Sequence, residues 1–154
     1  AYIFVRFRKW QYSLGAVIAL FHDVLIIISV FSLLYGILPF SLEIDQAFIA
    51  AILTVIGYSL NDTVVVFDRV REFQKTKVGD GKVIVNNALN STLSRTVNTS
   101  LTTIVVLLII FLFGGEVIRG FMFALILGVI IGTYSSLFIA TPIMVDTSKL
   151  KKIT

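Results

Sequence analysis

The sequence contains no cysteine and a single histidine, His22. These absences exclude disulfides, thiolate chemistry and cysteine-based metal sites, and one histidine alone cannot build a zinc site. Charged residues are scarce, at 14%, whereas a typical soluble domain has about 25%. Hydrophobic residues make up 57% of the 154 residues, and the mean hydropathy is +0.97. A chain of this size cannot bury so much apolar surface in a water-soluble core. The composition therefore excludes a soluble enzyme and a disordered tail and predicts a membrane protein.

Four long runs lack charged residues and histidine, and each indicates a helix that crosses the membrane. A spanning helix needs about 20 mainly apolar residues. Extending the shorter runs over neighbouring polar residues gives four predicted helices, near 14–38, 46–67, 97–115 and 119–143. Strands of a membrane barrel would alternate apolar and polar residues, and these runs do not. The expected fold class is an all-α membrane protein.

The basic residues lie almost entirely on one side of these helices, since Arg119 is the only one in the two connections on the other side. The positive-inside rule places the basic side, and both ends of the chain, in the cytoplasm. The asymmetry also explains the pI of about 9.5, so no nucleic-acid partner is required. The resulting division of the chain is a basic cytoplasmic segment at 1–13, a four-helix region at 14–145 with a cytoplasmic loop near 68–95, and a basic cytoplasmic tail at 146–154.

Two shorter segments carry local predictions. Residues 1–5 are apolar and do not begin with methionine, which indicates the last turn of an earlier transmembrane helix in a longer chain. The sequence Gly79-Asp80-Gly81 is typical of a turn. Apolar and polar residues then alternate over 82–93, which predicts a short amphipathic helix on the inner membrane surface.

Three groups of polar side chains lie within the predicted spans, where ionisable residues are costly and usually face the bundle interior. The first is Asp62 with its neighbours Asn61 and Thr63, on the same helical face as Tyr58. The second is the pair His22-Asp23. The third is a stripe that follows Arg95 at helical spacing and consists of Asn98, Thr99, Thr102 and Thr103. All three groups are expected in the cytoplasmic half of the membrane, close to one another.

A carboxylate near an arginine and a polar stripe is suited to proton binding. Burial favours the neutral acid and a nearby arginine favours the carboxylate, so a movement of Arg95 would bind or release a proton at Asp62. Structural alternatives stay open for each group. Asp62 would be a hydrogen-bond anchor between helices, and His22-Asp23 would be a structural polar pair. Arg95 would lie at the membrane interface with a snorkelling side chain. The hydroxyl stripe would provide packing contacts between helices.

Small residues recur every four positions in the fourth predicted helix. Such rows let two helix backbones approach closely, either as a static contact or as a surface along which helices slide. The row consists of Gly120, Ala124, Gly128, Gly132, Ser136 and Ala140.

Residues 57–72, GYSLNDTVVVFDRVRE, closely resemble the signature of the SecF family, the second half of the SecD–SecF protein-export membrane complex. Further matching segments are His22-Asp23 and residues 89–96, 113–115 and 128–136, so the resemblance covers nearly the whole chain. It implies an RND-type bundle in which this chain supplies helices three to six of a six-helix half. The first helix and the periplasmic domain of the family are not in this sequence.

The resemblance also implies a function. The chain would be part of a SecF subunit, or of a fused SecDF chain, that couples the proton motive force to preprotein translocation across the bacterial inner membrane. Asp62 and Arg95 match the residues linked to proton transport in the family. Four more motif residues fall at the cytoplasmic boundary, and these are Asp68, Arg69, Arg71 and Glu72.

The resemblance further implies the partners SecD, the SecYEG channel, YajC and YidC, with the preprotein contacting the periplasmic domain. Protons would be the coupling ion, with no cofactor, no metal and no enzymatic step. Two alternatives remain open. One is a non-conducting scaffold of the translocon, and the other is an RND-type proton-coupled exporter of lipids or small molecules.

Overall fold

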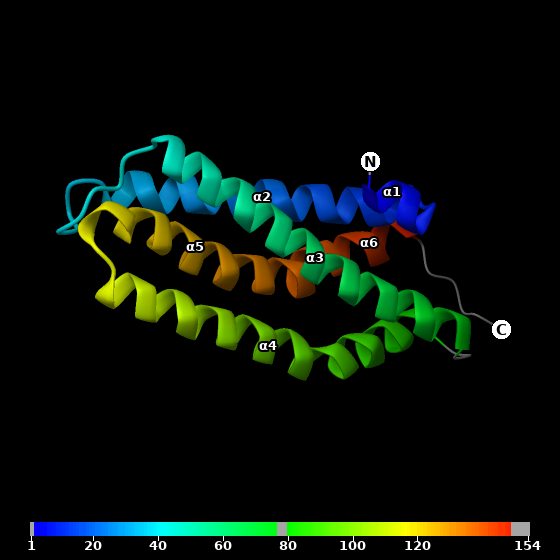
Figure 1. Cartoon of the computed structure of the whole chain (residues 1–154). Helices are drawn as coiled ribbons and strands as arrows, with labels where there is room; N and C mark the ends of the chain where they lie inside the picture. Colours follow the sequence, from blue (N-terminus) through cyan, green and yellow to red (C-terminus); the bar gives the residue numbers. More distant parts are fainter. Residues whose placement is uncertain (1, 77–79, 149–154) are drawn as a thin grey trace.

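The computed structural model describes residues 2–76 and 80–148, and these form a bundle of long helices (Figure 1). The helices are α1 (Tyr2–Phe7), α2 (Trp10–Leu34), α3 (Gln46–Thr76), α4 (Gly81–Phe113), α5 (Glu116–Ser135), the π-helix η1 (Ser136–Ala140) and α6 (Thr141–Ser148). The last three elements follow one another without a break. The described residues contain no strand.

Four helical segments are long and apolar enough to cross a membrane. They are α2, α3, α4 and the continuous segment Glu116–Ser148. The prediction of an all-α membrane protein with four spans is therefore confirmed. The first span is shifted, because α2 covers Trp10–Leu34 rather than 14–38. It begins two residues after Arg8, whose positive φ of 54° turns the chain between α1 and α2.

Most of the range 68–95, which was predicted as a loop between two spans, is helical. α3 continues to Thr76 and α4 begins at Gly81, so the connection between them is short. The predicted surface helix at 82–93 forms the first turns of α4 instead of a separate element. The prediction ended the second span before Asp68 and began the third after Arg95, but a helix can continue beyond its apolar stretch with a charged surface. Asp80 starts α4, since its side chain accepts a hydrogen bond from the backbone N–H of Lys82 at 3.2 Å. Ala1, residues 77–79 of the predicted loop and turn, and residues 149–154 of the predicted tail lie outside the described residues.

α1, α6, the last turns of α3 and the first turns of α4 lie at one end of the bundle (Figure 1). The α2–α3 and α4–α5 connections lie at the other end. An ion pair of 2.9 Å between Arg6 of α1 and Asp68 of α3 belongs to the first end. The second end carries Glu43, Asp45 and Glu116, and Asp45 caps α3 by accepting from the backbone N–H of Phe48 at 2.8 Å.

Two apolar clusters fill the bundle, one toward each end. The cluster toward α1 consists of Ile3, Phe7, Tyr12, Ala16, Ala19, Phe67, Val70, Val85, Ala88, Ala140 and Met144. The cluster toward the opposite end consists of Ile27, Phe31, Leu42, Phe48, Ala51, Val55, Ala124 and Leu125. Between these clusters, each of α2, α3 and the segment Glu116–Ser148 buries polar side chains, which in α3 and the last segment lie among apolar ones. The polar side chains are Asp23, Ser59, Thr63, Ser135 and Ser136. The bundle therefore has a polar layer between two apolar ones.

The row of small residues on α5 brings this helix close to α3. A Cβ atom added to Gly128 would overlap the side chain of Val55, and one added to Gly132 would lie 3.0 Å from the Cβ of Ser59. Gly120 lies in the same way against the backbone carbonyl of Ser41. Ala124 is fully buried. The glycines thus set the distance between the two helices.

We expect Gly128→Ala to destabilise the bundle by about 1–3 kcal/mol, because the added methyl overlaps a stiff β-branched side chain and α3 must move. The measurement is the thermal unfolding midpoint of the full-length protein in detergent. Gly57→Ala is the matched control, since a Cβ there meets open space and alanine favours the helix. Equal midpoints for the two variants would contradict the close contact at Gly128.

Candidate functional site: a polar layer inside the bundle

The two carboxylates of the polar layer lie near the middle of their helices. Asp62 is about 24 Å from the start of α3 and about 21 Å from its end, at 1.5 Å per residue. Asp23 is about 20 Å from the start of α2 and about 17 Å from its end by the same rise. Both carboxylates therefore lie inside helices that are long and apolar enough to cross a membrane.

Asp62 is half-buried and connects three helices. Its Oδ2 atom accepts a hydrogen bond of 2.7 Å from the hydroxyl of Ser136, the first residue of η1. Its Oδ1 atom accepts one of 3.3 Å from the hydroxyl of Thr96 in α4. A change in the charge of Asp62 therefore acts on contacts to both neighbouring helices.

Arg95 is near Asp62 but does not pair with it. Its charge is close enough to act on the Asp62 carboxylate. No ion pair or hydrogen bond joins the two side chains in the described part of the chain. The Arg95 side chain is exposed and lines an open groove of about 430 Å³ between α3 and α4, together with Asp68, Arg69 and Glu72. The structure thus places Arg95 on the open side of the layer.

Several predicted neighbours of Asp62 face elsewhere. Asn61 is exposed, and the hydroxyl of Thr99 donates to the backbone carbonyl of Arg95, 2.9 Å away in its own helix. Thr102 and Thr103 also bond to backbone carbonyls of α4. The predicted stripe from Asn98 to Thr103 therefore does not run toward Asp62. One residue along a helix corresponds to a rotation of about 100°. The predicted stripe was counted from Arg95. The buried face of α4 includes the next residue, Thr96, so the predicted stripe faces outward.

The inner face of α4 is made by Thr92, Thr96 and Ser100, which are all buried. The Ser100 hydroxyl lies 2.5 Å from that of Thr133 in α5. Tyr58 of α3 donates to the same Ser100 oxygen at 3.4 Å, near the limit for a hydrogen bond. Thr63 is buried in α3. The contacts of Ser100 and Thr133 extend the polar layer beyond Asp62, between α4 and α5.

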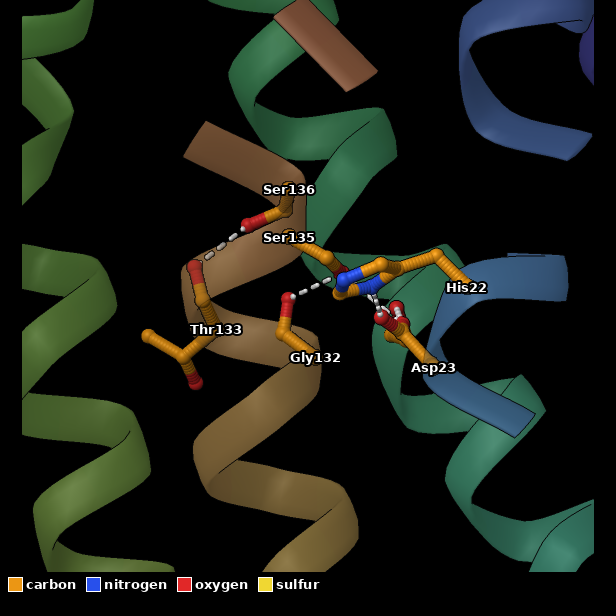
Figure 2. A network of polar contacts seen from close by, with 7 residues as sticks. His22, Asp23, Gly132, Thr133, Ser135 and Ser136 are labelled. Carbon is orange, nitrogen blue, oxygen red and sulfur yellow. Dashed lines mark hydrogen bonds and ion pairs between the residues drawn. The ribbon is translucent and has the colours of Figure 1, made fainter. Parts of the chain in front are cut away.

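Asp23 is the most buried ionisable side chain of the layer, at 1% exposure. Its Oδ2 atom accepts two hydrogen bonds of 2.8 Å, from Ser59 of α3 and Ser135 of α5. Its Oδ1 atom lies 3.2 Å from Nδ1 of His22, whose side chain is 32% exposed (Figure 2). Asp23 thus joins α2 to α3 and α5.

The consecutive residues Ser135 and Ser136 each bond to one of the two carboxylates. Ser135 donates to Asp23 and Ser136 to Asp62. The π-helix η1 begins at Ser136, and π-turns are frequent at functional sites. Sequence reasoning included Ser136 only as a small packing residue and missed Ser135, Ser59, Thr96 and Ser100. The adjacent serines at the end of the small-residue row were the available signal.

The motif residues beyond the layer form surface contacts between α1, α3 and α4. In addition to the Arg6–Asp68 pair, Arg69 pairs with Glu72 at 2.7 Å and donates from Nε to the hydroxyl of Ser91 at 2.9 Å. Arg71 donates to the backbone carbonyl of Arg6 at 3.4 Å. Exposed ion pairs contribute about 0–1 kcal/mol each, so these contacts orient the helix ends more than they stabilise the fold.

Comparison with known proteins identifies the family. The model of the family described as "Protein export membrane protein SecD/SecF, C-terminal" matches residues 1–150. The chain belongs to this family. It is 62% identical over 146 residues to the protein translocase subunit SecF of Rhodothermus marinus, covering 94% of this chain and 47% of that protein. It is 51% identical over 144 residues to the SecF subunit of Cereibacter sphaeroides, covering 93% of this chain and 42% of that protein.

Solved structures of SecDF share the fold. The crystal structure of SecDF from Thermus thermophilus, described as a translocon-associated membrane protein, is 41% identical with a TM-score of 0.83 over 96% of this chain and 20% of that one. SecDF in the super-membrane-facing form is 40% identical, with a TM-score of 0.82 over 96% and 19% of the two chains. The chain thus spans about half the length of the SecF subunits that it matches.

We expect Ser135→Ala to lower the stability of the SecF bundle by about 1 kcal/mol, since hydrogen bonds between membrane helices contribute about 0.6–1.7 kcal/mol. The variant removes the hydroxyl that links α5 to Asp23. The measurement is the unfolding midpoint of the full-length protein in mixed micelles. In the control Ser29→Ala the lost hydroxyl is exposed and bonds to its own helix at Leu25. If Ser135→Ala unfolds no more readily than Ser29→Ala, the bond to Asp23 does not stabilise the bundle.

Proposed function

We propose that this chain is the C-terminal transmembrane part of a SecF subunit, or of the SecF half of a fused SecDF chain. In this proposal it couples proton movement to the export of preproteins across the inner membrane of a bacterium. The family match and the names of the relatives support the assignment to protein export. Support for proton coupling comes from the geometry around Asp62.

The observation that carries the proposal is the isolated position of Asp62 within the membrane. The carboxyl lies near the middle of α3 and bonds only to hydroxyls, from Thr96 and Ser136, among the described residues. An ionised carboxylate in the hydrocarbon region without a paired cation is costly, and such a residue is typical of a proton pathway. Protons would then be the coupling ion, with no further cofactor.

Binding of a proton would change how the helices are held together. The carboxylate accepts a short, charge-assisted hydrogen bond from Ser136 in η1 and a longer, weaker one from Thr96 in α4. Neutralisation weakens both bonds at once and allows α4 and η1 to shift relative to α3. One charge that crosses about 100 mV releases about 2.3 kcal/mol. Because about 1.4 kcal/mol is a factor of ten, this energy is enough to bias a two-state movement of the bundle tens of fold.

The rest of the proposal follows from the family. The partners would be SecD, the SecYEG channel, YajC and YidC, and the preprotein would contact the periplasmic domain of the whole protein. The basic end of the bundle would face the cytoplasm, in agreement with the positive-inside rule. No covalent chemistry is required at Asp62, so the proposed activity is transport and not enzymatic catalysis.

Asp62→Asn in the full-length protein tests the proposal. Asparagine keeps the size of the side chain and one oxygen acceptor but cannot exchange a proton. We expect normal assembly of the complex and loss of the export that depends on the proton gradient, measured by preprotein translocation into membrane vesicles with and without the gradient. Glu116→Gln at the far end of α5 is the matched carboxylate-to-amide control and should retain export. Gradient-dependent export by an assembled Asp62→Asn complex would favour the scaffold alternative.

Substitutions of Arg95 test how this residue acts on Asp62. Because Arg95 acts through its charge and not through a direct contact, we expect Arg95→Lys to keep most of the gradient-dependent export and Arg95→Gln to lose most of it. The measurement is the same vesicle assay, with assembly checked in parallel. Equal loss in both variants would show that the planar guanidinium, and not the charge alone, is required.

A further inference from the structure

We propose that His22 and Asp23 form a second proton-binding site, which the hydroxyls of Ser135 and Ser136 link to Asp62. The inference rests on the proposed function, because it adds a site to the same proton-coupled bundle. It is carried by the arrangement of the two carboxylates on either side of the paired serines.

The first argument is the burial of Asp23 beside a titratable partner. The carboxyl is 1% exposed near the middle of a membrane-spanning helix, and His22 is the one ionisable side chain bonded to it among the described residues. A proton held by this pair neutralises the carboxylate directly or pairs it with a histidinium. Because His22 is 32% exposed, the pair has a route for protons from the surface of the bundle (Figure 2).

Other charged groups on the elements packed around Asp23 are distant or already paired. Asp62 is the ionisable group of α3 that belongs to the same layer. Glu116 and Arg119 lie in the first turn of α5, about 24 Å or more along the axis from Ser135. In α1, Arg6 pairs with Asp68, while Asp146 of α6 lies ten residues beyond Ser136. The charge of the His22-Asp23 pair is therefore set mainly within the polar layer.

The second argument is that each serine has two acceptors for its single hydroxyl proton. Ser135 lies 2.8 Å from Asp23 Oδ2 and 3.2 Å from the backbone oxygen of Gly132. Ser136 lies 2.7 Å from Asp62 Oδ2 and 3.0 Å from the backbone oxygen of Thr133, and Figure 2 shows this second bond. A hydroxyl released by a protonated carboxyl can rotate to the backbone oxygen of its own helix.

Binding of a proton at one carboxyl therefore changes proton binding at the other. When Asp23 takes up a proton, the new O–H bond donates to a serine oxygen, and the Ser135 hydroxyl turns to Gly132. Ser135 and Ser136 are adjacent in the chain at the start of the π-turn, so a change at one displaces the other. Two interacting sites titrate as a coupled pair and not as independent groups.

The test is infrared difference spectroscopy of the full-length protein in its complex, reconstituted in lipid nanodiscs and titrated with pH. We expect two carboxylic-acid C=O bands that change with pH, one absent in Asp62→Asn and the other absent in Asp23→Asn. The midpoint of the Asp23 band should differ by about one pH unit or more between the wild type and Asp62→Asn, since the sites are coupled. If Asp23→Asn does not assemble, Asp23→Glu is the second variant. It keeps a carboxyl group and should shift the frequency of the Asp23 band.

The serines provide the test of the link. Ser135→Ala combined with Ser136→Ala should reduce the shift between the two midpoints to less than half, whereas Ser29→Ala should leave it unchanged. Two results would overturn the inference. One is an Asp23 band that is constant over the whole pH range, and the other is an Asp23 midpoint that is the same in the wild type and in Asp62→Asn. Failure of the proposed function is a separate result, since it requires an Asp62 band that does not titrate or export that survives Asp62→Asn.

Discussion

The arrangement of the four long helices depends on one constraint, which is that polar groups inside a membrane must find hydrogen-bond partners within the protein. Asp23 and Asp62 would be prohibitively costly as isolated groups in hydrocarbon. Each accepts hydroxyl bonds from two other helical segments, so satisfying both carboxylates fixes α2, α3, α4 and the α5–η1 segment relative to one another. The apolar clusters on either side fill the space but specify no such relation, because lipid is as apolar as they are.

Close packing makes these bonds possible, because serine side chains are short. The hydroxyls of Ser59 and Ser135 reach the same carboxylate oxygen only if α2, α3 and α5 nearly touch. Gly132 provides that approach opposite Ser59, and Gly15 of α2 lies directly against the backbone carbonyl of Ala140 at the end of the π-turn. The hydrogen bonds of the polar layer therefore depend on the row of small residues, and a larger residue in the row would also disturb the hydrogen bonds to the carboxylates.

The sequence alone predicted what depends on composition and on single costly residues. Hydropathy located the four spans, and the scarcity of charges in them drew attention to Asp62 and to His22-Asp23. It did not predict which neighbours these residues contact, because an error of one residue in helical phase rotates a side chain by about 100°. Thr96 and not Thr99 bonds to Asp62 for that reason. Helix ends were also misplaced, since charged residues end the membrane contact of α3 and α4 without ending the helices.

The two carboxylates differ in their access to the surroundings, and this difference gives the layer a direction. Asp62 is half-buried, and Arg95 near it lines an open groove, whereas Asp23 is enclosed and bonds to the partly exposed His22. The adjacent residues Ser135 of α5 and Ser136 of η1 bond to Asp23 and to Asp62, respectively. A signal that arrives at one side of the layer therefore has a covalently connected route to the other. The π-helix η1 departs from α-helical hydrogen bonding at the serine that bonds to Asp62, and such π-turns are frequent at functional sites.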